Sequence, residues 1–548
     1  MWRRAERRYL SGDRQDTIPL LPSIFDHIRS HMGPDGLSLA EAGLKLPDEN
    51  YQKARLGGKP DSIGFAPGAT DGILRGAPIS PKEGEEKATA LHEALLEFVR
   101  RRNPRSEARL VQLMVNSHAA TSLAPLLLSL SRRPPENLPR LYEEMRRFFL
   151  QSGHREVVKY AMSIVASYRK APDLLLFRTI ACHPEFTMYA VDAISKVSPD
   201  PVSEWIALAR VSRGWGKVSL VERLSESNRP EIWDYLLREG LENVPNLEGY
   251  IALPIAMRYK LHDILEGSTA DPGLLRGAAR ILHTLTFEAV DGGPNGNILD
   301  YPDGGLAVER FLAHFERVAS STEDFLTVAS IHQFVSSRDL DESRLRTAGW
   351  DSQRRASVSE VCNRILARTD WVERAKRALA SEDPKEQWRG ITVAKRLGIP
   401  LHDYFIDRLR KNPLDPGMWF HFIWGANEER IDEALKLARE VLHFESIATG
   451  PAEESLVGPG HERHDCVNYL LQELRRFPGK GWDMIRASLR SPVTTNRRFG
   501  LLALKRWRAS EATEEVVEAV RNALRDPSEH VRTEAKEVLA IFGRSTLS

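Results

Sequence analysis

Apolar residues recur every three to four positions along most of the chain from about residue 80 onward. The segment Lys82–Arg101 illustrates this pattern, because one stripe of it carries Ala88, Leu91, Leu95, Phe98 and Val99. Such a stripe is typical of an amphipathic helix with one buried face. No stretch alternates apolar and polar residues over the length of a half-buried strand. The pattern therefore predicts an all-α protein.

Further periodic segments are short, and Pro, Gly or Asp-Pro separates most of them from the next. They are Glu107–Asn116, Leu138–Gln151, Arg155–Ser167, Glu185–Val197, Val202–Val211, Pro230–Arg238 and Gly273–Thr286. Short helices with brief connections are typical of stacked helical hairpins. We therefore predict an α-solenoid, in which each hairpin packs against its neighbours along the chain.

The first 85 residues differ from the rest of the chain in composition and in hydrophobic pattern. A short amphipathic stretch, Ile18–Met32, leads into Leu56–Pro78, which is dense in glycine and proline. Because proline removes a helical hydrogen bond and glycine disfavours ordered helix, we expect no regular helix in this second segment. We interpret it as an irregular loop over neighbouring helices. The alternative is a loop that covers a substrate or contacts a phosphate.

A helix–proline turn–helix unit recurs in the C-terminal part. The turns Ser381–Pro384, Arg490–Pro492 and Arg525–Pro527 lead into the predicted helices Lys385–Leu397, Thr494–Trp507 and Ser528–Phe542. Pro492 and Pro527 lie 35 residues apart. This spacing is close to the roughly 40 residues of a two-helix solenoid repeat.

The last of these units has the clearest pattern. Asp526 is placed to cap the second helix, and Pro527 suits a first helical turn. One face of that helix is expected to be buried and the other to be exposed to solvent. The expected buried residues are Val531, Ala535, Val538, Leu539 and Phe542, and the expected exposed residues are His530, Arg532, Glu534 and Glu537.

Leu524–Leu539 resembles a HEAT repeat, with its Asp-Pro turn, its Val-Arg pair and its later Ala and Leu. The resemblance implies a right-handed stack of antiparallel helix pairs with a concave surface for partners. We divide the chain accordingly into an N-terminal segment at 1–85, a degenerate helical-hairpin array at 86–370, and HEAT-like C-terminal repeats at 371–548.

Composition narrows the functional classes. The 548 residues carry 77 Lys+Arg against 76 Asp+Glu, so the formal net charge of +1 disfavours general nucleic-acid binding, although local basic patches remain compatible with it. Only 3 cysteines are present, which fits a reducing cytoplasm. The basic N-terminus is followed by polar Ser11–Asp16, so we expect no secretory signal. The apolar run Leu123–Leu130 is too short to span a bilayer, and Pro125 interrupts it.

A second resemblance concerns the opening block Leu10–Met32, which is similar to the start of bacterial chains labelled limonene hydroxylase. This resemblance implies hydroxylation of the monoterpene limonene, followed by alcohol dehydrogenation, with a reduced nicotinamide cofactor. Such chemistry needs an oxygen-activating group, because side chains alone do not activate oxygen. No dinucleotide-binding glycine fingerprint or phosphate loop is present in the sequence.

The best candidate metal ligands are His461, His464 and Asp465, with Cys466 next to them. His461 and His464 would share a helix face, and a carboxylate would complete the two-His, one-carboxylate set of a non-haem metal site. The alternative is a pair of polar histidines at a helix N-terminus above a packed Cys466.

Three other parts of the sequence carry residue types suited to metal, ligand or thiol chemistry. The loop Asp291–Gly305 carries oxygen ligands suited to Ca²⁺, but its spacing does not fit an EF-hand, and a long turn is the simpler interpretation. Trp419–Trp424 is expected to be buried on more than one side, with an aromatic pocket for an apolar small molecule as the alternative. Cys182 and Cys362 sit at apolar helical positions, which predicts core packing.

Three functional hypotheses follow. The first is a cytoplasmic helical-repeat scaffold that holds a protein or peptide partner in its groove. The second is the limonene monooxygenase described above, with a reduced nicotinamide and a non-haem metal as its cofactors. The third is a nucleic-acid scaffold, and we rank it last. Its basis would be the short basic clusters Arg100–Arg102, Arg132–Arg133 and Arg497–Arg498, but acidic residues lie near them, and solvated helix faces explain them.

Overall fold

The computed structural model describes residues 18–55, 66–76, 81–267, 271–292, 296–424, 426–453 and 460–544. Contacts divide the chain into two compact units. The first comprises residues 1–49 and 65–393, and the second comprises residues 50–64 and 394–548. The predictions made for Met1–Asp16, and for residues 56–65 and 77–78 of the Gly/Pro-rich segment, lie outside the described residues.

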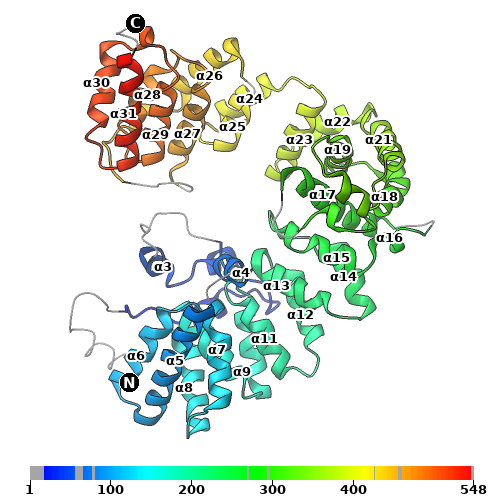
Figure 1. Ribbon diagram of the computed structural model, residues 1–548, viewed down its shortest axis with the longest axis vertical. Coiled ribbons are helices and arrows are strands. Elements are labelled where there is room, and N and C mark those ends of the chain that lie inside the picture. The colour runs from blue at the N-terminus through cyan, green and yellow to red at the C-terminus, as the bar shows by residue number, and fades with distance from the viewer. Residues whose placement is uncertain are drawn as a thin grey trace. The chain divides into compact units, whose positions relative to one another are not determined.

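The first unit consists of helices throughout its described part (Figure 1). Its α-helices are α2 (Ile24–Ser30), α4 (Ala69–Gly76), α5 (Pro81–Arg101), α6 (Pro104–Val115), α7 (Ala119–Arg132), α8 (Leu138–Gln151), α9 (Arg155–Ala166), α10 (Leu174–Ala181), α11 (Thr187–Val197), α12 (Pro201–Val211), α13 (Gly214–Ser225), α14 (Pro230–Glu239), α15 (Ala252–Arg258), α16 (Leu261–Ile264), α17 (Pro272–Asp291), α18 (Gly304–Val318), α19 (Thr322–Ser336), α20 (Glu342–Thr347), α21 (Ser352–Leu366), α22 (Asp370–Leu379) and α23 (Pro384–Arg396), whose last turn crosses the boundary between the units. Short 3₁₀ helices are η1 (Glu41–Leu44), η2 (Ala171–Asp173), η3 (Glu248–Tyr250) and η4 (Ile298–Asp300).

The second unit is built in the same way. Its helices are α24 (His402–Lys411), α25 (Pro416–Trp424), α26 (Glu428–Val441), η5 (Phe444–Ile447), α27 (Glu462–Leu474), α28 (Trp482–Ser488), α29 (Thr494–Leu504), η6 (Ala509–Glu511), α30 (Glu514–Ala523) and α31 (Glu529–Arg544), together with most of α3 (Glu49–Arg55). Among the described residues, one isolated bridge between Met32 and Leu39 is the extent of β-structure.

Alternate helices stack on one another, which is the arrangement of a solenoid. In the first unit α5, α7, α9, α11 and α13 pack in sequence, and so do α17, α19 and α21. In the second unit α25, α27, α29 and α31 do the same, while α28 and α30 pack against α29 and α31. The prediction of an all-α solenoid of stacked hairpins is thus confirmed. The predicted domain boundaries at residues 85 and 370 rest on changes in sequence composition and pattern, and they stay predictions.

The predicted apolar stripe of α5 is buried, since Ala88, Leu91, Leu95, Phe98 and Val99 are each at most 3% exposed. In α31, Val531, Ala535 and Val538 are fully buried, and Phe542 is 6% exposed. Glu534 is predicted to be exposed to solvent, but its side chain is only 12% exposed because it pairs with Arg498 and Lys505 of the preceding repeat. Burial of helix α31 thus extends beyond its apolar face.

The proline turns of the C-terminal unit share hydrogen bonds as well as sequence. Asp526 accepts a hydrogen bond from the backbone N–H of Ser528 at 2.9 Å, but α31 begins at Glu529, so this bond closes the turn before the helix and Asp526 is not its N-cap residue as predicted. Five residues after each proline stands an arginine, and Arg497 and Arg532 both donate to the two carbonyl groups of their own turn. The recurrence seen in the sequence is therefore repeated in atomic contacts.

One expectation about the Gly/Pro-rich segment was wrong. Residues 69–76 form the regular helix α4, although Gly72 and Gly76 lie within it. The helix forms because it packs against α7 and because Gly72 allows it to approach the indole of Trp215 closely. Tertiary packing outweighs the low helix propensity of glycine at this place.

No helix in the described ranges combines the length and the apolar character that a bilayer crossing needs. Leu123–Leu130 forms part of α7, and Pro125 lies inside that helix.

Candidate functional site

Three pockets in the described residues share one chemical character. The largest, of about 680 Å³, lies where α5 and α7 end and α6 and α8 begin. It is lined by Arg100, Arg101, Arg109, Arg133 and Arg140, by Glu93, Glu97 and Glu136, and by Leu96, Val99, Pro134, Pro135 and Asn137. Glu97 pairs with Arg101 and Arg109, and Glu93 pairs with Arg133. Arg100 and Arg140 have no ion-pair partner among the described residues, so the pocket keeps an excess of positive charge.

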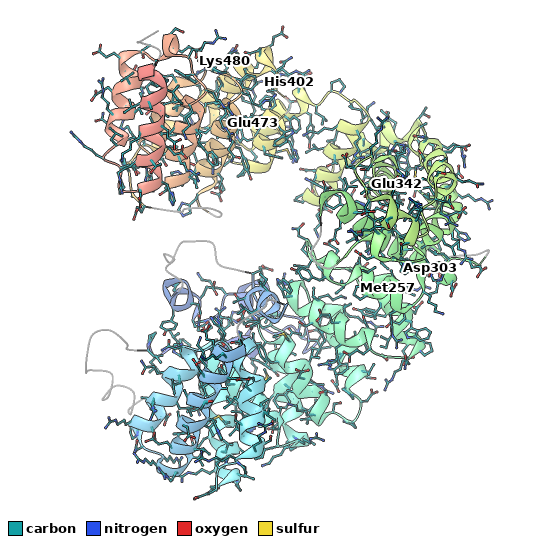
Figure 2. The ribbon with its side chains drawn as sticks, viewed as in Figure 1. Met257, Asp303, Glu342, His402, Glu473 and Lys480 are labelled. Atoms are coloured by element: carbon teal, nitrogen blue, oxygen red, sulfur yellow. The ribbon has the colours of Figure 1, made fainter. Side chains whose placement is uncertain are left out.

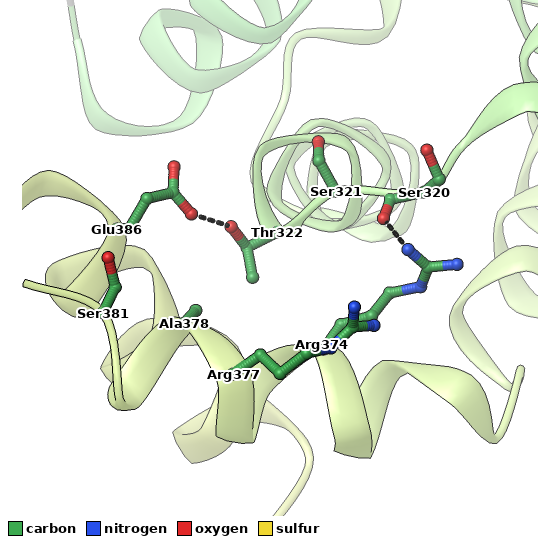
Figure 3. Close-up of a pocket in the computed structure, with 8 residues that line it drawn as sticks. All are labelled: Ser320, Ser321, Thr322, Arg374, Arg377, Ala378, Ser381 and Glu386. Carbon is green, nitrogen blue, oxygen red and sulfur yellow. Dashed lines mark hydrogen bonds between the residues drawn. The ribbon is translucent and has the colours of Figure 1, made fainter. Parts of the chain in front are cut away.

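A second pocket, of about 270 Å³, lies between the start of α19 and the α22–α23 turn (Figure 3). Thr322 donates a hydrogen bond to the Glu386 carboxylate at 3.1 Å, and Arg374 donates to the Ser320 carbonyl. The carboxylate of Asp324, in the first turn of α19, accepts from the backbone N–H groups of Ser320 and Ser321, and the N-cap residue Ser321 accepts from the N–H of Asp324. The acidic first turn offsets the partial positive charge of the helix N-terminus, and the exposed Arg377 adds a positive charge to the pocket.

The third pocket, of about 500 Å³, belongs to the second unit. Its lining is Gln472, Glu473, Arg475, Arg476, Pro478 and Arg506, from the end of α27, the following turn and the residues after α29. Glu473, labelled in Figure 2, pairs with Arg476 at 2.7 Å. Phe420, Trp424 and Tyr469, from α25 and α27, form an aromatic group, and Arg476 of the pocket lining donates to the backbone carbonyl of Trp424.

Taken together, the three linings hold ten arginines, five glutamates, and no lysine or aspartate. The whole chain is nearly neutral at +1, so positive charge is concentrated in the pockets. Arginine is well suited to carboxylates and phosphates, because its planar fork donates two parallel hydrogen bonds. The pockets therefore favour anionic groups of a partner.

A cluster of buried charges lies elsewhere in the first unit. Lys159 is 1% exposed, and its Nζ lies 2.5 Å from Asp71, 2.8 Å from Glu156 and 2.7 Å from Glu185. The second oxygen of Glu185 accepts from the N–H of Gly68, which has a φ of 79°, a region that favours glycine. This cluster therefore ties the turn before α4, and α4 itself, to α9 and to the start of α11.

The charges of the cluster shift one another's pKa values. Burial raises the pKa of Asp71 to about 6, and the neighbouring carboxylates of Glu156 and Glu185 add to the rise against the opposing effect of Lys159. Burial would also raise the pKa of Glu185, but the charges of Lys159 and Arg155 outweigh it and lower the value to about 2. For Lys159, the three carboxylates outweigh burial and raise the pKa. The cluster holds structure together, since no pocket described above reaches it.

The predicted metal ligands lie at the start of α27. The rings of His461 and His464 are 6.4 Å apart, and His464 Nδ1 lies 3.3 Å from both the Ser491 hydroxyl and the Asn496 amide. Among the described residues, no group of three or more His, Cys, Asp or Glu side chains is arranged to hold a metal ion. Cys466 is fully buried. A site formed by His461, His464 and Asp465, and the nicotinamide and non-haem metal cofactors, stay predictions.

The other candidate segments have local structural roles. Asn297 and Asp300, in the loop Asp291–Gly305 that is interpreted as a long turn, form the capping box of η4. Cys182 and Cys362 are buried free thiols, and burial raises the pKa of each to about 12. In α25, Trp419 and Phe422 are buried as expected, but Trp424 is 59% exposed.

Sequence reasoning named the arginine clusters but not their roles. Arg497 was expected to lie on a solvated face together with Arg498, yet it is fully buried. The Lys159 cluster was missed, because its members come from distant parts of the sequence. The only local signal was the three-residue spacing of Glu156 and Lys159, which is common on exposed helices too.

Comparisons with known proteins add little. No protein-family model matches the chain, and no curated protein matches it. Among solved structures, the chain is similar to the karyopherin Kap121p, whose structure has the extreme C-terminus of the protein phosphatase Cdc14p bound. The identity is 9%, the TM-score is 0.32, and the match covers 87% of this chain and 66% of that one.

It is also similar to a circular tandem repeat protein, with 14% identity, a TM-score of 0.14, and coverage of 87% and 98%. At these scores neither similarity carries an argument about function.

Proposed function

We propose that this protein is a helical-repeat scaffold that binds a protein or peptide partner. The observation that carries the proposal is the concentration of arginine in the three pockets of a chain that is otherwise nearly neutral. Ten arginines against five glutamates leave guanidinium groups without a counter-charge in these pockets. There, each guanidinium could hold a carboxylate of a partner by two parallel hydrogen bonds.

The repeat architecture supports the same proposal. Stacked hairpins present extended surfaces built from many similar units, and such surfaces suit macromolecular partners. The 35-residue recurrence of a proline turn with its arginine five residues later supports a HEAT-like identity for the C-terminal repeats. Three buried free cysteines are compatible with a cytoplasmic location, where thiols stay reduced.

A direct test is selection of a random peptide library on the purified full-length chain, followed by isothermal titration of the selected peptides. We expect saturable binding of peptides enriched in Asp and Glu, with affinity that falls as salt rises. Failure to select any saturable binder would refute the proposal.

Metal analysis of the same preparation separates the scaffold from the monooxygenase hypothesis. A stoichiometric metal that is lost in His461→Ala, together with oxygenation of limonene, would favour the enzyme instead.

A further inference from the structure

We propose that one surface of the second unit binds an acidic peptide that also carries a bulky apolar side chain. This surface, called here the α27 surface, consists of Phe420, Trp424 and Tyr469 together with the pocket lined by Gln472, Glu473, Arg475, Arg476, Pro478 and Arg506. The inference rests on the proposed scaffold function and deepens it by naming the site and the chemistry of the partner.

The apolar half of the α27 surface is a group of three aromatic rings. The ring centroid of Phe420 lies 5.2 Å from that of Trp424 and 5.4 Å from that of Tyr469. Trp424 nevertheless leaves 59% of its surface exposed, although the neighbouring Ile423 is fully buried. Aromatic side chains held by one another and open on one side can anchor a partner at little cost in conformational entropy.

The polar half carries two guanidinium groups without a counter-charge. Arg476 is engaged, since it donates to the Glu473 carboxylate at 2.7 Å and to the carbonyl groups of Trp424 and Ala426 at 3.2 Å each. Arg475 and Arg506 are exposed and have no hydrogen-bond or ion-pair partner for their side chains in the described residues. The pocket therefore has two free positive charges, which carboxylates of a partner would complement.

Two contacts link the halves. Arg476 lines the pocket and also donates to the backbone carbonyl of Trp424, so the end of α25 that carries Trp424 lies against the pocket. On α27, Tyr469 is one helical turn from Gln472 and Glu473, which places these three residues on the same helix face. A peptide seated on the rings would thus reach the arginines within a few residues.

A peptide fits this surface better than a nucleic acid. Binding along a phosphate backbone needs a basic stripe with many cations, whereas here two free arginines lie next to an apolar group. An acidic segment with one Trp, Phe or Leu would satisfy both halves. The spacing between its acidic and apolar side chains would give specificity.

The test uses the full-length chain and a fluorescein-labelled synthetic peptide in which a central tryptophan is flanked by glutamates. A matched peptide carries glutamines in place of the glutamates. Fluorescence anisotropy is expected to show saturable binding of the glutamate peptide, and binding of the glutamine peptide weaker by about tenfold or more. Doubling the salt concentration should weaken only the glutamate peptide.

Three variants locate the site. The double variant Arg475→Glu/Arg506→Glu and the single variant Trp424→Ala are each expected to weaken the glutamate peptide by about tenfold or more. Arg430→Glu makes the same charge reversal at an exposed arginine of α26 outside the surface, and Trp388→Ala removes a tryptophan that is 54% exposed in the first unit. Both controls should bind like the wild type, and circular dichroism should show unchanged helix content in every variant.

Three results would overturn the inference. The first is equal binding of the two peptides or no binding at about 1 mM, and the second is unchanged affinity in the double variant. The third is displacement of the peptide from the wild type by a single-stranded oligonucleotide or by anionic vesicles at lower concentrations than unlabelled peptide. If library-selected peptides bind the double variant as tightly as the wild type, they bind elsewhere. The assignment of the site to the α27 surface is then wrong, while the proposed scaffold function stands.

Discussion

The buried ion pair between Arg497 and Asp526 joins the last two repeats, and its removal gives the sharpest test of how they are held together. Arg497 is 0% and Asp526 2% exposed. The guanidinium donates to Asp526 from Nε at 2.7 Å and from Nη2 at 2.9 Å, and Nη1 donates to the carbonyls of Ser491 and Pro492. The two bonds to Asp526 join α29 to the turn before α31, and the two carbonyl bonds hold Arg497 to the turn before its own helix.

Arg497→Met keeps most of the apolar stem and removes all four hydrogen bonds. The Asp526 carboxylate would then stay buried with one remaining donor, the N–H of Ser528. Removing one partner of a buried ion pair costs about 3–5 kcal/mol, because the other charge is left uncompensated. Since each repeat of a solenoid contacts only its neighbours, we expect this loss to act on the C-terminal hairpins.

Hydrogen exchange measured by mass spectrometry resolves such local openings. Peptides from α29 and α31 of the variant should exchange about a hundredfold to a few thousandfold faster, since every 1.4 kcal/mol corresponds to a factor of ten. The matched control is Arg498→Met, the neighbouring arginine, whose side chain is 50% exposed and pairs with Glu534. It should cost about 1 kcal/mol or less.

A further variant, Arg497→Met/Asp526→Leu, replaces the pair by apolar side chains and should recover most of the lost protection. The reasoning is refuted if Arg497→Met changes exchange by less than tenfold, or if Arg498→Met has an equal effect.

Three more outcomes follow from the first unit. Asp71 has a raised pKa of about 6, so its contribution to stability is greatest below about pH 4 and is lost as the pH rises through 6. Calorimetry at several pH values should therefore show that Asp71→Asn lacks this part of the decrease in unfolding free energy with rising pH. An unchanged pH dependence would contradict the raised pKa of Asp71. Gly72→Val should lower stability by about 1–3 kcal/mol in urea unfolding, because its Cβ would fall within van der Waals distance of the Trp215 indole; a neutral effect would show that α4 is not packed there. The buried Cys362 thiol, with a pKa of about 12, should react with a thiol reagent only upon unfolding, and rapid labelling of the native protein would disprove its burial.

The sequence alone determined the helices and their repetition. Hydrophobic periodicity reports which face of a helix is apolar, so the buried stripe of Lys82–Arg101 could be predicted residue by residue. Proline and aspartate favour turns through local geometry and local hydrogen bonds, so the turn at Asp526 and Pro527 could also be predicted without a structure.

Tertiary structure alone decided which charges are buried and which pockets form. Arg497 and Arg498 are adjacent and chemically identical, yet one is buried against the next repeat and the other is exposed. Arg497 alone stands five residues after a turn proline, but this spacing does not show that it is buried, because burial of a charge depends on a partner brought close by packing. The same holds for Asp71, Lys159 and Glu185, whose ion pairs join segments far apart in sequence and leave no periodic pattern. The pocket at α27 likewise brings Arg475 and Arg506 together from two separate parts of the chain.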